Sequence, residues 1–273
     1  MDTKKLIVNA DDFGYSDHTV ELTIECFNTG LLSGATLMPN MCAFDKAAAF
    51  ALKHPEFCYG LHVCLTDERP VSNPADIPTL VDSHGNFWET REFVKRSFTG
   101  RISREEICKE ISAQLARIKQ AGLDVTHIDT HGHVHKIPVV FRALKNVLRT
   151  SEITTIRRMQ NLFYHQPGHV AQYYNNLANI FIRQLGKTSD YFLMVTGTLS
   201  EEDDDWLEFS IDHLPEGITE IGIHPGLDES QRRLDTLPLL RCAPGYLEQA
   251  GIELVTFRDL TQTQNIAVAC TMK

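Results

Sequence analysis

The chain has 273 residues, of which 42% are hydrophobic and 23% are charged, and its formal net charge is −10. This composition is that of an ordinary globular protein, the acidic balance argues against binding to a phosphate backbone, and no apolar run approaches the roughly 18 residues that a membrane span needs. We therefore expect neither a nucleic-acid nor a membrane partner, and a homo-oligomer stays open. Seven cysteines without close spacing predict reduced thiols and a cytoplasmic protein.

Short β-rich runs alternate with helical patterns along the chain. The predicted strands lie near residues 5–9, 34–38, 57–64, 125–129, 153–157, 191–195, 219–223 and 252–257. The predicted helices cover residues 17–28, 104–121, 139–148, 169–185 and 236–250. Seven or eight β/α units without a linker or a repeat indicate one α/β domain over residues 1–273, either a parallel barrel or an open doubly wound sheet.

One connection breaks this rhythm, at residues 66–102. It is rich in Pro, Asp and Asn, and a loop of that length is usually functional or disordered. Within it, the stretch LVDSHGNFW is compatible with a small hairpin that projects Phe87 or Trp88 over the rim of a barrel. The alternative is that both aromatic residues anchor the loop on the barrel.

Polar residues follow several of the predicted strands. Asp11 and Asp12 come directly after the first apolar run, and the repulsion between two adjacent carboxylates there indicates a cation. Neighbouring residues on a strand point to opposite faces. Asp11 and Asp12 can therefore both reach one pocket only if the strand has already ended, and we expect that it has. A barrel would bring the ends of all strands to one rim. The polar residues at these ends are Asp11, Asp12, Asn40, His62, His131, Arg157 and His224.

Four histidines lie within nine residues, in the stretch THIDTHGHVH. Alternation along an extended chain places His127, Asp129 and His131 on one face. A metal site that stays open for substrate rarely takes more than three protein ligands. We therefore expect one or two of these histidines to bind metal and the others, including His133 and His135, to form local hydrogen bonds.

This set of residues fits metal-assisted hydrolysis. The residues predicted to hold one divalent cation are Asp12, His62 and His131. Asp11 would then accept a proton from water, and His224 would protonate a leaving amine. Arg157 would orient Asp11 and keep it ionised. Taken alone, His62 would be a core histidine, so the argument depends on the whole set.

The motifs IVNADDFGYS, GLHVCLT, THIDTHGHVH followed by IP, IRRM and HPG resemble, in that order, those of the YdjC-like carbohydrate deacetylases, which include the chitooligosaccharide deacetylases. The resemblance implies a distorted (β/α) barrel of seven or eight strands, related to the polysaccharide deacetylases. It also implies metal-dependent removal of acetyl groups from N-acetylated sugars. By motif, the metal ligands fall on Asp12, His62 and His131, the base on Asp11 and the acid on His224.

The resemblance implies Mg²⁺, whereas two imidazoles and one carboxylate rather suit Zn²⁺, Co²⁺ or Mn²⁺. The expected partner is a small carbohydrate, with Asn40, Phe87 and Trp88 as candidate substrate-binding residues. Two other functions stay open. A metal-dependent phosphoesterase would need more basic residues than Lys136, Arg157 and Arg158 near the site, and a non-catalytic sugar- or metal-binding relative would need neither base nor acid.

Overall fold

The computed structural model describes residues 4–165, 169–195, 205–226, 236–242, 245–260 and 270–271. Its strands are β1 (Lys4–Phe13), β2 (Gly34–Leu37), β3 (Cys58–Val63), β4 (Ile128–Thr130), β5 (Leu162–Phe163), β6 (Tyr191–Met194), β7 (Gly217–Ile223), β8 (Ile252–Leu254) and β9 (Cys270–Thr271). Its α-helices are α1 (Asp17–Asn28), α2 (Phe44–Lys53), α3 (Thr90–Phe98), α4 (Arg104–Gln120), α5 (Pro138–Leu148), α6 (His169–Ile182), α7 (Trp206–Asp212), α9 (Leu237–Arg241) and α10 (Tyr246–Gln249). Short 3-10 helices are η1 (Pro74–Asp76), η2 (His131–Lys136) and η5 (Phe257–Asp259).

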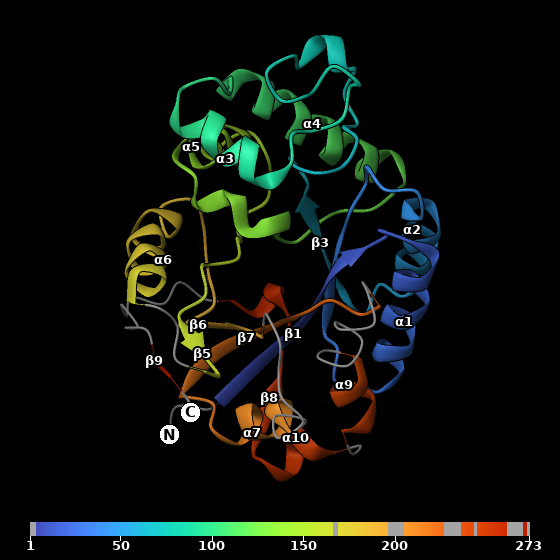
Figure 1. Ribbon diagram of the computed structural model, residues 1–273. Helices are drawn as coiled ribbons and strands as arrows, with labels where there is room; N and C mark the ends of the chain where they lie inside the picture. The colour runs from blue at the N-terminus through green and yellow to red at the C-terminus, as the bar shows by residue number, and fades with distance from the viewer. Residues whose placement is uncertain are drawn as a thin grey trace.

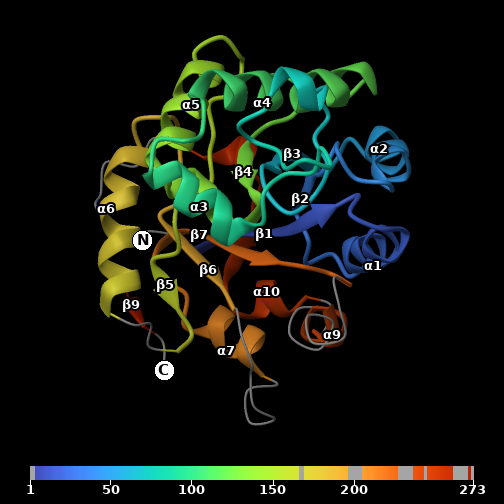
Figure 2. The same ribbon diagram turned by 45° about the horizontal axis from the view of Figure 1, so that its top comes forward.

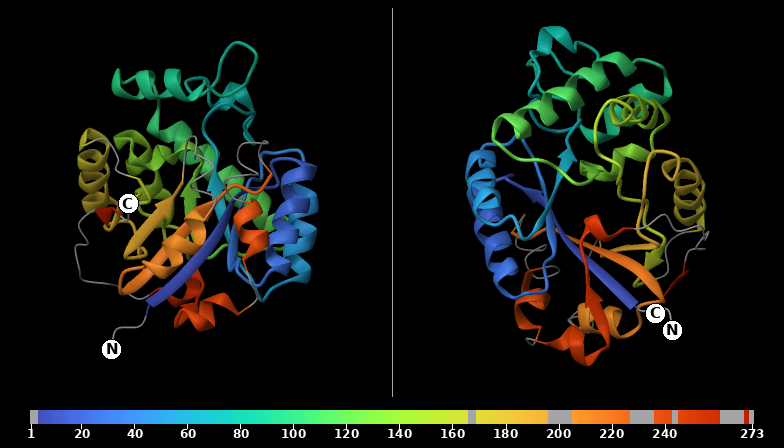
Figure 3. Two further views of the ribbon diagram at one scale, coloured as in Figure 1. Left: turned by 60° about the horizontal axis from the view of Figure 1, so that its bottom comes forward. Right: turned by 180° about the vertical axis from the view of Figure 1, so that it is seen from behind.

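A seven-stranded parallel sheet forms the centre of the molecule, in the order β4-β3-β2-β1-β7-β6 with β8 also paired to β1. One edge of β1 pairs with β7, while the other edge pairs with β8 over residues 4–6 and with β2 from residue 9 onward. The helices surround the strands, with α6 on the opposite side from α1 and α2 (Figures 1, 2 and 3). The predicted distorted (β/α) barrel is confirmed as a curled, incompletely closed parallel sheet.

Seven of the eight predicted strands correspond to strands of the central sheet. The strand predicted at residues 153–157 is wrong, because this segment makes only isolated parallel bridges, from Ile156 to Ile128 and from Thr155 to Lys187. The segment nevertheless lies along the barrel wall. The backbone N–H of Arg157 bonds to the Ile128 carbonyl at 3.0 Å, so Arg157 enters the barrel beside β4.

One predicted helix differs from the structure, and the helix predicted over residues 104–121 is confirmed. The helix predicted over residues 236–250 is two short helices, α9 and α10, and Gly245 before α10 has a left-handed φ of 79° that interrupts any continuous helix. The helix predicted from residue 104 is α4, capped by Ser103, whose hydroxyl accepts the Glu106 N–H at 3.3 Å. Helices α2, α3 and α7 were not predicted.

The segment 66–102 is more ordered than its composition predicts. The expected hairpin is present, closed by an antiparallel bridge between Val81 and Phe87, and α3 follows it. Glu110, buried on α4, accepts the backbone N–H groups of Val71 and Ser72 at 2.9 Å each. Buried carboxylates that bond backbone amides hold a loop in one conformation, since breaking these bonds would leave a buried charge unsatisfied.

The composition predicted that the protein has no membrane partner and that its thiols are reduced. None of the described helices is both long and apolar enough to cross a bilayer. The six cysteines whose side chains the structure describes form no disulfide with one another.

Candidate active site

Polar side chains from three strands meet at the carboxyl edge of the sheet. His62 on β3 pairs in register with Asp129 on β4, and His131 follows two residues later, at the start of η2. From β1, Asp12 reaches both histidines. Carboxyl ends of parallel strands share one edge, which is why residues far apart in the sequence converge here.

The two adjacent aspartates reach this edge through a distortion of β1. We expected the strand to have ended before them, but β1 continues to Phe13. Its register with β2 shifts between Ala10 and Phe13, and Asp12 has a left-handed φ of 58°. A bulge of this kind re-aims a side chain, and Asp tolerates the left-handed region better than most residues. Asp11 and Asp12 therefore lie on the same side of the sheet edge.

Asp12, His62 and His131 form a cluster that could hold a metal ion. Asp12 Oδ1 lies 3.2 Å from His62 Nε2 and 3.0 Å from His131 Nδ1, and the three ligand atoms lie within 4.8 Å of one another. Asp12 Oδ2 is buried and has no hydrogen-bond partner among the described residues. A carboxylate and two imidazoles converging on one point, with an unsatisfied buried oxygen, are suitable ligands for a divalent cation.

Asp129 hydrogen-bonds to His62 through the ring nitrogen that does not face Asp12. Its Oδ1 lies 2.7 Å from His62 Nδ1, and its Oδ2 accepts the Thr36 hydroxyl at 3.1 Å. A carboxylate on Nδ1 fixes the tautomer of the ring and leaves the Nε2 lone pair facing Asp12, the arrangement found behind metal-binding histidines. Burial lowers the pKa of His62, but the charges and hydrogen bonds of Asp129 and Asp12 raise it well above its usual value. Proton and metal therefore compete for this ring.

Arg157 holds Asp11 in the ionised state. Its two terminal nitrogens donate to the two oxygens of Asp11, at 2.5 and 2.7 Å, and Asn9 donates a third bond at 2.9 Å. Burial raises the pKa of Asp11, but the attraction of Arg157 outweighs burial and lowers it well below the usual range. His224 Nε2 lies 3.8 Å from Asp11 Oδ2. An ionised carboxylate and an imidazole thus stand beside the cluster.

A second group of possible ligand atoms, from Asp11, His62 and Asp129, also lies within 4.8 Å. These atoms are already engaged. Both Asp11 and Asp129 accept ion pairs from Arg157, and Asp129 bonds His62 Nδ1. A cation there would meet the guanidinium at close range, so the first cluster is the better metal site.

The charge balance of the buried site also favours a cation. Four buried carboxylates, those of Asp11, Asp12, Asp129 and Glu220, surround one buried guanidinium, that of Arg157. Their formal charge is −3, or −2 when Glu220 is protonated. Burial raises the pKa of Glu220 to about 7 although Arg157 opposes this. Uncompensated buried charge is costly, and a divalent ion at Asp12 would bring the sum to −1, or to zero when Glu220 is protonated.

Glu220 should give the protein a measurable pH dependence. Its carboxylate accepts the Arg157 Nε–H, and its pKa is about 7 in the folded chain against 4.5 in an ordinary setting. Between these values the folded state keeps a proton that the unfolded state has lost, so stability falls as pH rises through this window. Glu220→Gln should remove this decline, roughly 1 kcal/mol per pH unit, in urea unfolding. A wild-type-minus-variant difference that is constant with pH would refute the assignment.

The other histidines of THIDTHGHVH lie away from the ligand atoms. His127 is fully buried and stacks on Phe257 with ring centroids 3.6 Å apart. His133 packs edge-on against Phe192, and His135 Nδ1 bonds the Thr130 hydroxyl at 2.6 Å. The stretch therefore contributes one imidazole to the cluster.

The three candidate substrate-binding residues have different surroundings in the structure. Phe87 is only 3% exposed and belongs to the hydrophobic core, so the prediction that its ring faces a sugar is wrong, because the hairpin turns it inward as an anchor. The Trp88 indole N–H donates to the Thr79 carbonyl at 3.0 Å, and the Arg96 guanidinium lies 3.6 Å over its ring. Asn40 donates to the Arg69 carbonyl at 3.0 Å.

Sequence reasoning assigned no role to Asp129 or Glu220. Asp129 had a signal, since it alternates with His127 and His131. Glu220 had no such signal in the sequence. A single acidic residue in the β7 run GITEIGI resembles a surface residue, and only the structure shows that it pairs with Arg157.

Known proteins are similar to this chain in sequence and in fold. A carbohydrate deacetylase from Geobacillus stearothermophilus is 33% identical over 265 residues, which are 93% of this chain and 96% of the relative. A chitooligosaccharide deacetylase from Serratia marcescens is 38% identical over 141 residues, 50% of this chain and 53% of the relative.

Among solved structures, an Enterococcus faecalis protein provisionally named a cellobiose-phosphate cleavage protein is similar in fold. It has a TM-score of 0.73 at 24% identity and covers 94% of this chain and 98% of its own. The model of the YdjC-like protein family matches residues 5–258, which include every residue of the cluster and its neighbours. The chain therefore belongs to the YdjC-like family.

Proposed function

We propose that this protein is a metal-dependent carbohydrate N-deacetylase, which hydrolyses the acetamide of N-acetylated sugars such as chitooligosaccharides and releases acetate. The observation that carries the proposal is the convergence of Asp12, His62 and His131 beside an ionised Asp11. The names of the relatives, carbohydrate deacetylase and chitooligosaccharide deacetylase, support the same reaction. Free thiols fit the reducing cytoplasm as its location.

The geometry supports a division of labour among these residues, which is part of the proposal. When bound, a divalent ion supplies Lewis-acid polarisation of the acetyl carbonyl and of water. Asp11, ionised and fixed by Arg157, accepts the proton of the attacking water. His224 donates a proton to the nitrogen of the sugar as the C–N bond breaks, so that the products are acetate and an amine.

The strong ion pair sets a limit on Asp11 as a base. General base catalysis works best when the pKa of the base lies near the operating pH. Because Arg157 holds the pKa of Asp11 low, Asp11 is a weak proton acceptor whose advantage is its position. We therefore place its contribution nearer the lower end of the usual range of about 10² to 10⁴.

The ligand types favour some divalent metals over others. Mg²⁺ prefers oxygen ligands and keeps several waters, whereas two imidazoles and one carboxylate suit Zn²⁺, Co²⁺ or Mn²⁺ better. We propose one of these three ions, with Mg²⁺ as the alternative implied by family resemblance.

The surroundings of the cluster disfavour a phosphoesterase. Arg157 is engaged by three carboxylates, and Arg158 is buried and donates to the backbone carbonyls of Ser189 and Asp190. Lys136 lines a pocket beside α6. None of the three is available to hold a phosphate at the cluster.

The decisive test is a screen for acetate release. Metal-stripped protein would be incubated with N-acetylated mono- and oligosaccharides, with Zn²⁺, Co²⁺, Mn²⁺ or Mg²⁺ added singly, and acetate and free amine would be quantified together. Equal amounts of both products are expected. Phosphate release from phosphorylated sugars in a parallel arm would establish the phosphoesterase instead, and metal binding without any turnover would establish a binding protein.

Trp88 should act chiefly as an anchor of the segment 66–102. Trp88→Ala removes the bond to Thr79 and the stacking of Arg96, so we expect the free energy of unfolding to fall by about 1–3 kcal/mol, with little change in KM for a chitooligosaccharide. Urea unfolding and steady-state kinetics measure the two effects. A raised KM at unchanged stability would instead make Trp88 a sugar-contacting residue.

A further inference from the structure

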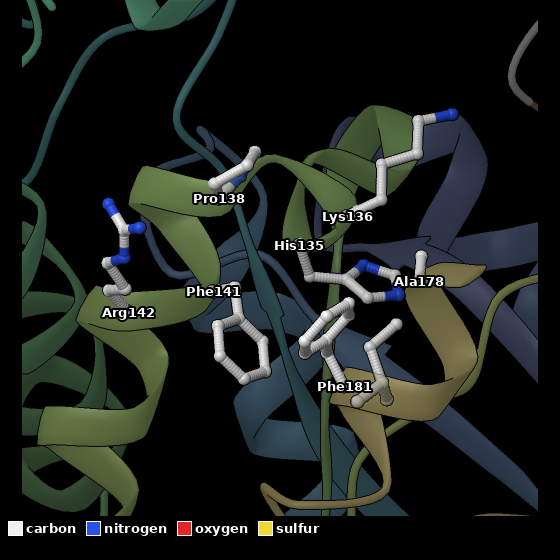
Figure 4. A pocket seen from close by; sticks show the side chains of 8 residues that line it. His135, Lys136, Pro138, Phe141, Arg142, Ala178 and Phe181 are labelled. Atoms are coloured by element: carbon white, nitrogen blue, oxygen red, sulfur yellow. The ribbon is translucent and has the colours of Figure 1, made fainter. Parts of the chain in front are cut away.

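The pocket beside α6 is separate from the metal cluster. It lies between α5 and α6, and Figure 4 shows the rings of Phe141 and Phe181 facing each other within it. None of the residues that line it belongs to the cluster of Asp12, His62 and His131. A sugar whose acetamide reaches the cluster therefore contacts other residues, at the carboxyl edge of the sheet.

The segment that follows β3 is hydrogen-bonded to residues beyond β1 and β2. The Tyr15 hydroxyl, beyond β1, donates to Glu68 Oε1 at 3.1 Å. The Asn40 amide, beyond β2, donates to the Arg69 carbonyl at 3.0 Å. Strand β3, which leads into the segment, carries the metal ligand His62. The segment therefore lies at the same edge of the sheet as the metal cluster.

The same segment also reaches the turn that carries His131. Asp67 accepts the backbone N–H of Thr90 at 3.1 Å and its hydroxyl at 2.6 Å. Thr90 Oγ1 in turn lies 3.9 Å from the position that a Cβ on Gly132 would take, and Gly132 directly follows His131 in the chain. The segment thus runs past the cluster from the β1 side to the β4 side.

The cluster is accessible to solvent on the side of His131. The His131 side chain is 25% exposed, whereas those of His62 and Asp12 are 3% and 2% exposed. A substrate therefore approaches the buried ligands past His131. Because the contact between Asp67 and Thr90 lies beside the His131 turn, the segment borders this approach.

Tyr15 has a fixed position relative to the metal ligand Asp12. Its backbone N–H bonds to the Asp12 carbonyl at 3.0 Å. Gly14, inside this turn, has a φ of 107°, and a Cβ there would lie 3.2 Å from the Cα of Phe44. Burial, the carboxylate of Glu68 and the charge of Asp12 all raise the pKa of Tyr15. The phenol therefore keeps its proton and donates it to Glu68.

Glu68 has a fixed backbone and one carboxylate oxygen without a partner. Its N–H bonds to the Thr66 carbonyl and its carbonyl accepts the N–H of Phe87, at 2.8 Å each. Oε1 accepts the Tyr15 hydroxyl, whereas Oε2 has no hydrogen-bond or ion-pair partner in the part of the chain that the structure describes. The side chain is half-buried. A positioned, ionised acceptor of this kind suits a hydroxyl donor.

We propose that Glu68, oriented by the Tyr15 hydroxyl, is a substrate-binding residue that accepts a hydrogen bond from a hydroxyl group of the sugar that carries the acetamide. This inference rests on the proposed deacetylase function and adds to it a residue that recognises the sugar. The metal cluster and Asp11 act on the acetamide, which many molecules share. Glu68 distinguishes an N-acetylated sugar from other acetamides.

Glu68→Ala should raise KM for N,N′-diacetylchitobiose about tenfold or more, as loss of a hydrogen bond to a charged acceptor does. The value of kcat should stay nearly unchanged, because ground state and transition state both keep this contact. Glu68→Gln, which retains an acceptor oxygen, should recover part of the affinity, and Tyr15→Phe should raise KM by less than Glu68→Ala. The matched control is Asp82→Asn. Asp82 accepts the backbone N–H groups of His84 and Asn86 within the same segment, so this variant should leave KM unchanged.

Substrate analogues distinguish direct contact with the sugar from a purely structural role of Glu68. Wild type and Glu68→Ala would be assayed with N,N′-diacetylchitobiose and with analogues that each lack one hydroxyl group, after circular dichroism has confirmed that the variant is folded. With the analogue that lacks the bonded hydroxyl, Glu68→Ala should cause no further loss of kcat/KM, since both changes remove the same hydrogen bond.

Two outcomes would overturn the inference, and they differ in what happens to the proposed function. If acetate is released but the effects of Glu68→Ala and of every analogue on kcat/KM are additive, Glu68 does not contact the sugar, and the deacetylase function stands. If wild-type protein with added metal releases no acetate from any N-acetylated sugar, the proposed function is wrong and the role of Glu68 is refuted with it.

Discussion

His131→Ala should abolish both metal retention and acetate release. The variant removes one of three ligands whose atoms lie within 4.8 Å of one another. Loss of a mere supporting partner of a metal ligand costs 10–100-fold in affinity, so loss of a ligand should cost more than about 100-fold. Asp12→Ala and His62→Ala should behave in the same way. Elemental analysis after dialysis, together with acetate release, measures the effect.

His133→Asn is the matched control for these variants. His133 lies two residues from His131 in the same turn, and its left-handed φ of 51° suits Asn. Metal content should match that of the wild type. If His131→Ala keeps full metal occupancy while His133→Asn loses metal, the ligand assignment is wrong and His133 replaces His131.

Asp11→Asn should lose turnover but keep metal. The substitution preserves shape, but it replaces one of the two oxygens that accept from Arg157 with an NH2 group and removes proton acceptance. Because Arg157 already holds the pKa of Asp11 low, the fall in kcat should be nearer 10² than 10⁴, within the usual range of about 10² to 10⁴ for a general base. KM should change little, since the cluster remains in place. Steady-state kinetics and metal analysis of one preparation give both numbers.

Asp12→Asn separates the two adjacent aspartates. It should weaken metal affinity, and activity should be partly recovered at high metal concentration. Asp11→Asn should show no such recovery. Reversed behaviour, with Asp11→Asn losing metal and regaining turnover on metal addition, would show that the two roles are exchanged.

The convergence of strand ends was predictable from the sequence because it depends on a general property of parallel sheets. Asp12, His62 and His131 each follow or end an apolar β run, and their residue types suit one cation. How β1 presents its two aspartates was not predictable. The bulge and the left-handed φ of Asp12 arise from the pairing of β1 with β2, and pairing cannot be read from one strand alone.

The ion pairs of Arg157 could not be predicted from the sequence either. The pairs Arg157–Asp11 and Arg157–Glu220 join residues 146 and 63 positions apart, and such long-range contacts leave no local pattern. For Phe87, the sequence suggested a role that the packing does not support. An aromatic residue at a hairpin was compatible with a projecting or an anchoring role, and only the packing of the hairpin on the core decides between them.

Helix α6 marks a further limit of pattern reading. Its period predicted a helix over residues 169–185, and the structure has one over residues 169–182. The apolar residues of such a helix would ordinarily be assigned to the core. On the buried side, the amides of Asn175 and Asn179 bind backbone groups beside the core residues Ala178 and Ile182. The periodicity therefore identified the helix correctly but did not show that amides share its buried side.

The most direct test of the proposed function is a titration of metal-stripped wild-type protein with one divalent ion in the presence of a chitooligosaccharide. Acetate and free amine would be measured at each addition, and bound metal determined in parallel. The geometry of Asp12, His62 and His131 predicts no release without metal, equal release of acetate and amine as metal is added, and saturation at one ion per chain. Acetate release that is unchanged by stripping, or one bound ion per chain without any acetate, would contradict it.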